Sequence, residues 1–252
     1  MFRYFIELSY NGSSYHGWQV QPNAPSVQGE LNKALSLLLK QEIQVVGAGR
    51  TDTGVHASFF VAHFDSLLPV ENPGTLTNKL NRFLGKPIAI KSIYPVVTDA
   101  HARFSALSRT YRYHIGKSKD PFNCSFVFQP HPLPDIKKMN EACRLLLAHT
   151  DFTSFSKLHT GVKTNNCRVL EAGWKEEGEL LVFTIKADRF LRDMVRAIVG
   201  TLLKVGQGKL SMEGFGQIIE SRNRCHAGTS VPGHALFLCH VEYPDNLKVK
   251  SE

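Results

Sequence analysis

The chain has 252 residues, of which 42% are hydrophobic and 21% charged, a balance typical of a globular protein with one large or two small domains. No apolar run approaches the ~20 residues that a membrane-spanning helix needs, so no membrane association is expected. Lys and Arg number 30 against 22 Asp and Glu, and the net charge of +8 favours a polyanionic partner such as nucleic acid, although a basic enzyme of another kind would show the same excess.

The first half of the chain is predicted to alternate between strands and helices. Residues 2–10 have the period of a strand, and Ser26 is expected to cap a helix. A short strand is predicted over 43–46, and a strand buried on both faces over 58–65. Asn72-Pro73 opens a second helix, and strands are expected over 86–96 and 108–115. The predicted inward faces of the two helices are Val27, Leu31, Ala34, Leu35 and Leu38, and Leu76, Leu80 and Phe83.

The second half repeats this alternation. A helix is predicted within 132–149, and a hairpin is predicted from strands 167–176 and 179–187, with its turn at Glu176-Glu177-Gly178. Helices over 190–206 and 212–222 and a strand over 235–243 complete the chain. The first of these helices should turn Ile136, Met139, Cys143 and Leu146 inward. Antiparallel strands beside crossover helices predict an α+β fold with helices mainly on one face of the sheet.

The cysteines predict a reducing environment. There are five of them, an odd number, and they are widely spaced without a C-x-x-C pair. That pattern favours free thiols in a cytoplasmic protein over a disulfide framework or a zinc ribbon. The eleven histidines form no recognised metal-binding spacing, so no metal is expected.

The segment GAGRTDTGVHA, residues 47–57, gathers the most chemically versatile side chains. Its spacing fits neither a dinucleotide-binding loop nor a P-loop, and strand-like residues follow where either motif needs a helix. What remains is a glycine-framed loop that presents Arg50 and Asp52 from the same side. On these residues alone two interpretations stay open, a functional carboxylate beside a guanidinium or a salt bridge in a surface turn.

This segment resembles the active-site signature of the tRNA pseudouridine synthase A family, G-x-G-R-T-D-x-G-V-H-A. Further segments resemble that family in the same order along the chain, which extends the resemblance from about residue 4 to residue 243. They are YNGSSYHGWQ (10–19), VQ (27–28), ARFSA (102–106), RTYRY (109–113), DFTSF (151–155) and MVRAIVG (194–200). Mild departures are Phe237, where the family often has tyrosine, and residues 190–193, where some members have histidine.

The resemblance implies an α+β pseudouridine synthase fold in which two RRM-like halves join into a mostly antiparallel sheet with a central active-site cleft. The expected division is an N-terminal half over residues 1–105, which carries Asp52, and a C-terminal half over 106–252. The second half carries Tyr111 and Arg196.

The resemblance also implies roles for five residues. Asp52 takes the position of the catalytic aspartate, and Arg50 that of a residue that displaces and positions a flipped nucleotide. Tyr111 corresponds to a tyrosine that stacks on the target base, and Arg196 to a helix arginine that pairs with the aspartate. Leu236 corresponds to an apolar residue that lines the uracil pocket.

Some of these residues also have a plain structural interpretation. Tyr111 shares a strand face with Tyr113, and Leu236 lies in an apolar strand, so both fit a protein core. Arg196 interrupts an apolar helix, where a charge is costly unless it has a partner. An arginine on the outer face of that helix would instead be solvated.

The function that the resemblance implies is isomerisation of uridine to pseudouridine at positions 38, 39 and 40 of the tRNA anticodon stem-loop. The expected enzyme is a cytoplasmic homodimer that binds tRNA and needs neither a metal nor an organic cofactor. Whether Asp52 attacks C1′ or removes a ribose proton stays open. The alternatives are a pseudouridine synthase for another tRNA position or another RNA, and a non-catalytic RNA-binding protein with the same fold.

Overall fold

A computed structural model describes residues 1–157 and 164–249. The described residues fall into two compact units, one formed by Met1–Leu107 together with the segment after Phe237, and the other by Ser108–Phe237. The chain therefore leaves the first unit after Leu107 and returns to it near its C-terminal end. The division into halves at residues 105 and 106 stays a prediction.

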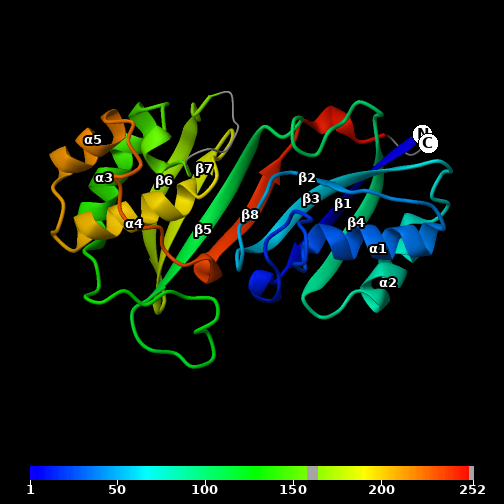
Figure 1. Cartoon of the computed structure of the whole chain (residues 1–252), viewed down its shortest axis with the longest axis horizontal. Coiled ribbons are helices and arrows are strands. Elements are labelled where there is room, and N and C mark those ends of the chain that lie inside the picture. Colours follow the sequence, from blue (N-terminus) through cyan, green and yellow to red (C-terminus); the bar gives the residue numbers. More distant parts are fainter. Residues whose placement is uncertain (158–163, 250–252) are drawn as a thin grey trace. The chain divides into compact units, whose positions relative to one another are not determined.

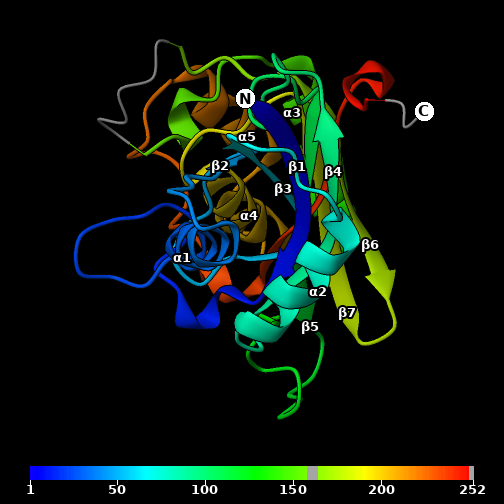
Figure 2. The same cartoon turned by 90° about the vertical axis from the view of Figure 1, so that its right-hand side faces the viewer.

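The first unit contains sheet strands in the order β4-β1-β3, with antiparallel β4–β1 and β1–β3 pairs and the short β2 paired antiparallel to β3. Strand β8 follows β3 in the strand order and belongs to this unit from Leu238 onward. Figure 1 shows two helices, α1 and α2, side by side across this sheet, and Figure 2 shows α2 alongside β4. The elements are β1 Phe2–Tyr10, α1 Val27–Leu39, β2 Val46–Gly47, β3 His56–Ser66, α2 Pro73–Phe83, β4 Ile88–Val96 and β8 Leu236–Glu242.

The second unit contains an antiparallel sheet of order β5-β7-β6, and its three helices contact one another. The predicted hairpin is confirmed, and Gly178 takes the left-handed backbone (φ +58°) that its tight turn requires. The elements are β5 Ser108–Gly116, α3 Ile136–Ala148, β6 Val169–Glu177, β7 Leu180–Ala187, α4 Met194–Gly206 and α5 Met212–Glu220. Short 3-10 turns occur at Gly12–Ser14, Thr153–Phe155, Gly233–Ala235 and Asp245–Leu247.

The mixed α+β class and the predicted helix caps are confirmed. Ser26 Oγ accepts a hydrogen bond from the Gly29 N–H (3.2 Å), and Asn72 Oδ1 accepts one from the Thr75 N–H (2.8 Å). Each cap satisfies a backbone donor that has no partner within its helix. Among the described residues, no helix is long and apolar enough to cross a membrane.

One predicted core position is wrong, and two others are only partly buried. Phe83 ends α2 and is 40% exposed, because the helix stops there and Leu84 turns inward in its place, with 6% exposure. Leu38 of α1 and Ile136 of α3 are only half-buried, since each lies in the terminal turn of its helix.

Element boundaries differ from the predicted ones where side chains accept backbone hydrogen bonds or where prolines cannot donate them. The predicted strand over 43–46 forms only at Val46–Gly47, because the Ile43 and Val45 N–H groups donate to side chains of α1, Ser36 Oγ (2.8 Å) and Asn32 Oδ1 (2.9 Å). Helix α3 begins after its cap Asp135, past two prolines that cannot donate to a helix.

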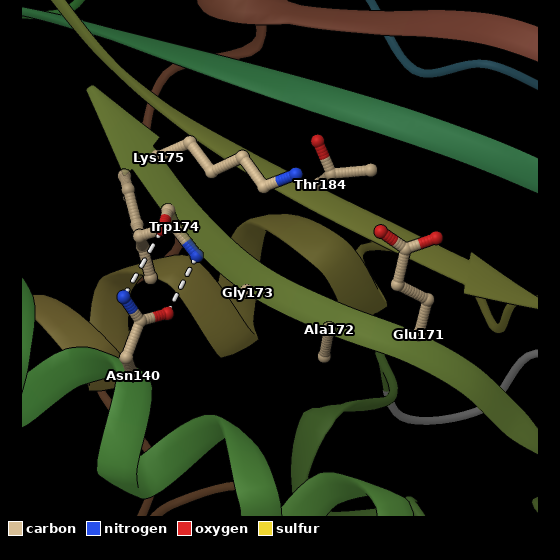
Figure 3. Close-up of a pocket in the computed structure, with 7 residues that line it drawn as sticks. All are labelled: Asn140, Glu171, Ala172, Gly173, Trp174, Lys175 and Thr184. Atoms are coloured by element: carbon tan, nitrogen blue, oxygen red, sulfur yellow. Dashed lines mark hydrogen bonds between the residues drawn. The ribbon is translucent and has the colours of Figure 1, made fainter.

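The outer edge of β6 is covered by a side chain of α3. Figure 3 shows the Asn140 amide bound to the Trp174 backbone, donating from Nδ2 to the carbonyl oxygen (3.0 Å) and accepting at Oδ1 from the N–H (2.7 Å). The indole of Trp174 is buried and lies 5.1 Å from the Phe183 ring. At Trp174 a helix side chain thus takes the place of a neighbouring strand, which β6 lacks on this edge within the described part of the chain.

Removing this amide should destabilise the second unit. Asn140→Ala leaves both Trp174 backbone groups without their partner, so we expect a loss of about 1–3 kcal/mol in the free energy of unfolding. Urea unfolding followed by circular dichroism measures the loss. Gln217→Ala, which removes an exposed contact to Glu213 at 3.4 Å, is the control and should change stability by less than ~0.5 kcal/mol. Equal effects of the two variants would contradict this account of the edge.

Candidate active site

The glycine-framed segment forms a loop between β2 and β3, as its residues predict. The chain leaves β2 at Gly47 and enters β3 at His56. The Asp52 carbonyl oxygen accepts a hydrogen bond from the Val55 N–H (3.1 Å), and Gly54 has φ +75°. Asp52 therefore begins a tight turn that needs a left-handed residue. Its side chain is half-buried, whereas Arg50 is exposed.

Residues 10–19 lie against this loop and hold the residue just before Asp52. The Tyr10 hydroxyl and Thr51 Oγ1 are 2.9 Å apart and share a hydrogen bond, and the Trp18 N–H donates to the Thr51 carbonyl oxygen at 3.2 Å. Thr51 is 8% exposed. The backbone entering Asp52 is thereby fixed by both a side chain and a main-chain contact.

The same segment holds the residues after Asp52. The Gly54 N–H donates to the Tyr15 carbonyl oxygen (3.4 Å), and the Gly12 N–H donates to Nδ1 of His56 (3.0 Å), a ring that is 1% exposed. His56 is therefore a structural acceptor in this loop. Across residues 1–157 and 164–249, no group of three or more His, Cys, Asp or Glu side chains is placed to hold a metal ion.

Two glycines allow the close approach of these segments. A Cβ on Gly12 would lie 2.1 Å from the Val55 carbonyl oxygen, and a Cβ on Gly17 would lie 2.3 Å from the Thr51 carbonyl oxygen. Gly17 also has φ +92°, a conformation that other residues rarely adopt. The segment that contains these glycines carries the family resemblance, but their contacts with the Asp52 loop could not be predicted from neighbouring residues.

Another segment that carries the family resemblance, residues 102–106, is anchored within the first unit. The Ala102 N–H donates to His63 Nδ1 (3.1 Å), and Tyr243 donates its hydroxyl to the Ala102 carbonyl oxygen (2.5 Å). Burial, with smaller effects from His101 and Arg3, lowers the pKa of His63 to about 4. The ring is therefore neutral at physiological pH and remains an acceptor for Ala102.

Arg196 lies in the first turn of α4 and is held at two points. Its Nε donates to the Val231 carbonyl oxygen (2.7 Å), and its NH1 lies 3.0 Å from Oδ1 of Asp193. The charge in this apolar helix thus has partners, as its sequence context demands. The pairing of Arg196 with Asp52 stays a prediction.

Tyr111 and Tyr113 occupy the same face of β5 with different surroundings. Tyr113 is fully buried, and its hydroxyl donates to the Pro232 carbonyl oxygen (3.1 Å); burial raises the pKa of this phenol. Tyr111 is 9% exposed, and its ring meets that of Phe190 edge-on at 5.0 Å and 85°. Tyr113 is therefore the core tyrosine, and the plane of the Tyr111 ring is set by Phe190.

The five predicted site residues are divided between the units. Arg50 and Asp52 lie in the first, and Tyr111, Arg196 and Leu236 in the second. Leu236 is the first residue of β8 and is 5% exposed. The shared role of these residues stays a prediction.

A cavity of about 260 Å³ lies beside β6 in the second unit (Figure 3). It includes the Asn140 contact described above and contains none of the five predicted site residues. Its lining consists of Asn140, Glu171, Ala172, Gly173, Trp174, Lys175 and Thr184. The cavity lies along the edge of β6 where Asn140 binds the Trp174 backbone, and its charged side chains are scattered and exposed. We therefore assign it no part in the candidate active site.

The family described as tRNA pseudouridine synthase matches residues 8–105 and 142–244. The chain belongs to this family. The matched ranges include Arg50, Asp52, Arg196 and Leu236, whereas Tyr111 lies in the stretch between them. The resemblance noted from the sequence is thus confirmed, and with it the expectation of an isomerase rather than a non-catalytic protein.

Full-length relatives support this membership. The tRNA pseudouridine synthase A of Parabacteroides distasonis is 57% identical over 247 residues, which cover 98% of each chain. The protein of the same name from Bacteroides thetaiotaomicron is 56% identical, covering 98% of this chain and 93% of its own. That from Francisella tularensis subsp. novicida is 38% identical, covering 97% of this chain and 95% of its own.

Substitution of Gly17 should disrupt the loop while the Asp52 side chain keeps its chemistry. In Gly17→Ala the new methyl group would collide with the Thr51 carbonyl oxygen in a left-handed backbone, so we expect pseudouridine formation to fall by ~10-fold or more. A tRNA conversion assay and the thermal unfolding midpoint measure the effect. Gly85→Ala is the control, because its Cβ would make an ordinary contact of 3.5 Å with Pro87. Normal conversion by Gly17→Ala would show that the close approach is dispensable.

Proposed function

We propose that this chain converts uridine to pseudouridine in the anticodon stem-loop of tRNA, at positions 38, 39 and 40, with Asp52 as the catalytic carboxylate. Membership of the tRNA pseudouridine synthase family supports the reaction. The observation that carries the assignment of Asp52 is its loop, in which Thr51 before it and Gly54 after it are both tied to residues 10–19.

The reaction requires a carboxylate that is held still while a base turns. The N-glycosidic bond between uracil N1 and ribose C1′ breaks, the uracil rotates, and its C5 forms the new bond to C1′, after which C5 loses its proton and N1 gains one. Attack by Asp52 on C1′ and removal of a ribose proton by Asp52 both need the side chain in one fixed place beside the sugar. The tethered turn supplies that constraint.

The other predicted site residues take complementary roles in this proposal. Tyr111 stacks on the target base, since its ring orientation is set by the edge-on contact with Phe190. Arg50, exposed on the same loop as Asp52, positions the displaced nucleotide. Arg196 partners the catalytic carboxylate, and Leu236 lines the uracil pocket.

Binding of tRNA is proposed to rest mainly on charge and shape. The net charge of +8 is dispersed along the sequence, which suits recognition of a folded RNA through its backbone. We further propose that the enzyme acts as a homodimer in the cytoplasm. Its tRNA substrate would be present there, and the reducing conditions would keep its free cysteines as thiols.

Position-resolved mapping of pseudouridine on unmodified tRNA treated with the purified protein tests the function and the target together. We expect pseudouridine at positions 38, 39 and 40 only. Modification elsewhere in tRNA, or in another RNA, would replace the proposed target, and binding without modification would refute the enzymatic assignment.

Asp52→Asn should lower the rate of pseudouridine formation by ~1000-fold or more, because the amide can neither attack C1′ nor accept a proton as a carboxylate does. Single-turnover conversion measures the rate, and filter binding should give a tRNA Kd within about twofold of the wild type. Asp245→Asn, at an exposed 3-10 turn, is the matched control and should retain full activity. Substantial turnover by Asp52→Asn would overturn the catalytic role.

Binding of tRNA should weaken steeply with salt. Raising monovalent salt from 50 to 200 mM should increase the Kd by ~10-fold or more, because each neutralised phosphate releases counterions. Measuring binding with Asp52→Asn keeps turnover out of the experiment. A Kd that stays flat over this range would contradict electrostatic docking.

A further inference from the structure

Asp193, immediately before α4, has an unusual backbone and an unusual use of its side chain. It is a non-glycine residue in the left-handed region, with φ +67°, and its carboxylate makes no capping hydrogen bond to α4. Instead Oδ1 lies 3.0 Å from NH1 of Arg196, and Oδ2 accepts a hydrogen bond from the Ser230 hydroxyl. The residue turns toward an arginine one helical turn ahead of it.

The guanidinium of Arg196 is consequently anchored twice. Besides the Asp193 contact, its Nε donates to the Val231 carbonyl oxygen at 2.7 Å. The long arginine side chain has several rotatable bonds, so one anchor would leave the plane of the guanidinium free to turn. Two anchors on different atoms fix that plane.

A second arginine, Arg224, contacts the residues that hold Arg196. Arg224 donates to Ser230 Oγ (2.9 Å) and to the Gly228 carbonyl oxygen (3.1 Å), and its NH2 lies 3.8 Å from Oδ2 of Asp193. The side chains of Arg224, Asp193 and Arg196 are each at most 23% exposed. One carboxylate thus sits between two guanidiniums, and the cluster keeps a net positive charge with which to meet an anion.

The segment that contains Ser230 is itself pressed onto α4. A Cβ on Gly200 would lie 1.9 Å from the Thr229 carbonyl oxygen, and the Gly228 N–H donates to Thr201 Oγ1 (2.8 Å). The Val231 N–H in turn donates to the Arg196 carbonyl oxygen (3.2 Å). Both anchors of the guanidinium therefore rest on a rigid base.

We propose that Asp193 is a positioning residue for the pseudouridine synthase reaction, which holds Arg196 in the orientation that its role requires. The inference rests on the proposed function, in which Arg196 works beside the catalytic carboxylate. The side-chain oxygen of Asp193 carries the effect through its contact with NH1, and the left-handed backbone directs that oxygen toward the helix.

The test separates the side chain from the backbone. Asp193→Gly retains a backbone that accepts positive φ and removes the carboxylate, so we expect kcat to fall by ~10-fold with a tRNA Kd within about twofold. Asp193→Asn keeps a side-chain oxygen that can lie next to NH1, where Oδ1 now lies at 3.0 Å, and it should restore kcat to within ~3-fold of the wild type. Loss of kcat in both variants alike, or in neither, would overturn positioning by this oxygen.

A double-mutant cycle distinguishes positioning from a general structural effect. If Asp193 acts through Arg196, then Asp193→Gly should change kcat by less than ~2-fold in an Arg196→Met background. An equal fall in both backgrounds would mean that Asp193 merely supports the fold. Glu177→Gln, which breaks the exposed ion pair of Glu177 with Arg112, is the control and should leave kcat unchanged.

Two further readouts keep the outcomes separate. Ser230→Ala removes the hydroxyl that donates to the Asp193 carboxylate, and it should lower kcat only when Arg196 is present. If Asp193→Gly fails to fold, the result for Ser230→Ala decides whether Asp193 positions Arg196. If Arg196→Met keeps the wild-type rate, the proposed role of Arg196 fails and the role of Asp193 fails with it. If Arg196→Met is impaired while Asp193→Gly is not, only the positioning inference is overturned.

Discussion

The contact between residues 10–19 and the turn that carries Asp52 is the constraint on which the first unit depends. Carbonyl oxygens of Thr51 and Val55 occupy the space that side chains of Gly17 and Gly12 would otherwise fill. Backbone can approach backbone this closely only at glycine, and the approach allows the Trp18 and Gly54 hydrogen bonds to form. A strand end, a loop and a turn are thereby joined into one support for a single carboxylate.

The second unit reaches a similar rigidity by different means. There the functional candidate is a cation, and the surrounding structure provides oxygens: a carbonyl of Val231 and the carboxylate of Asp193. Glycine again permits the approach, since Gly200 lets the chain at Thr229 lie on α4. In the first unit residues distant in sequence hold the backbone of the turn that carries Asp52, and in the second the distant Val231 holds the side chain of Arg196. Substitutions far along the chain are therefore expected to affect both residues.

Much of this was predictable from the sequence because it depends on local chemistry. Caps at Ser26 and Asn72, the hairpin turn at Gly178 and the loop around Asp52 all follow from residues within a few positions of one another. What could not be predicted depends on partners far along the chain. The carboxylate of Asp193 is held by Ser230, and Arg196 has its second anchor at Val231. The inward position after α2 goes to Leu84 rather than Phe83 because of where the helix stops.

The Asn140 amide on β6 has a consequence for association. An unpaired strand edge offers alternating N–H and C=O groups to any other extended chain, and such edges invite pairing between copies of a protein. At Trp174 both outward groups are already taken by Asn140. An approaching strand would have to displace that amide before it gained two hydrogen bonds, so continuation of the sheet into a neighbouring molecule is disfavoured at this point.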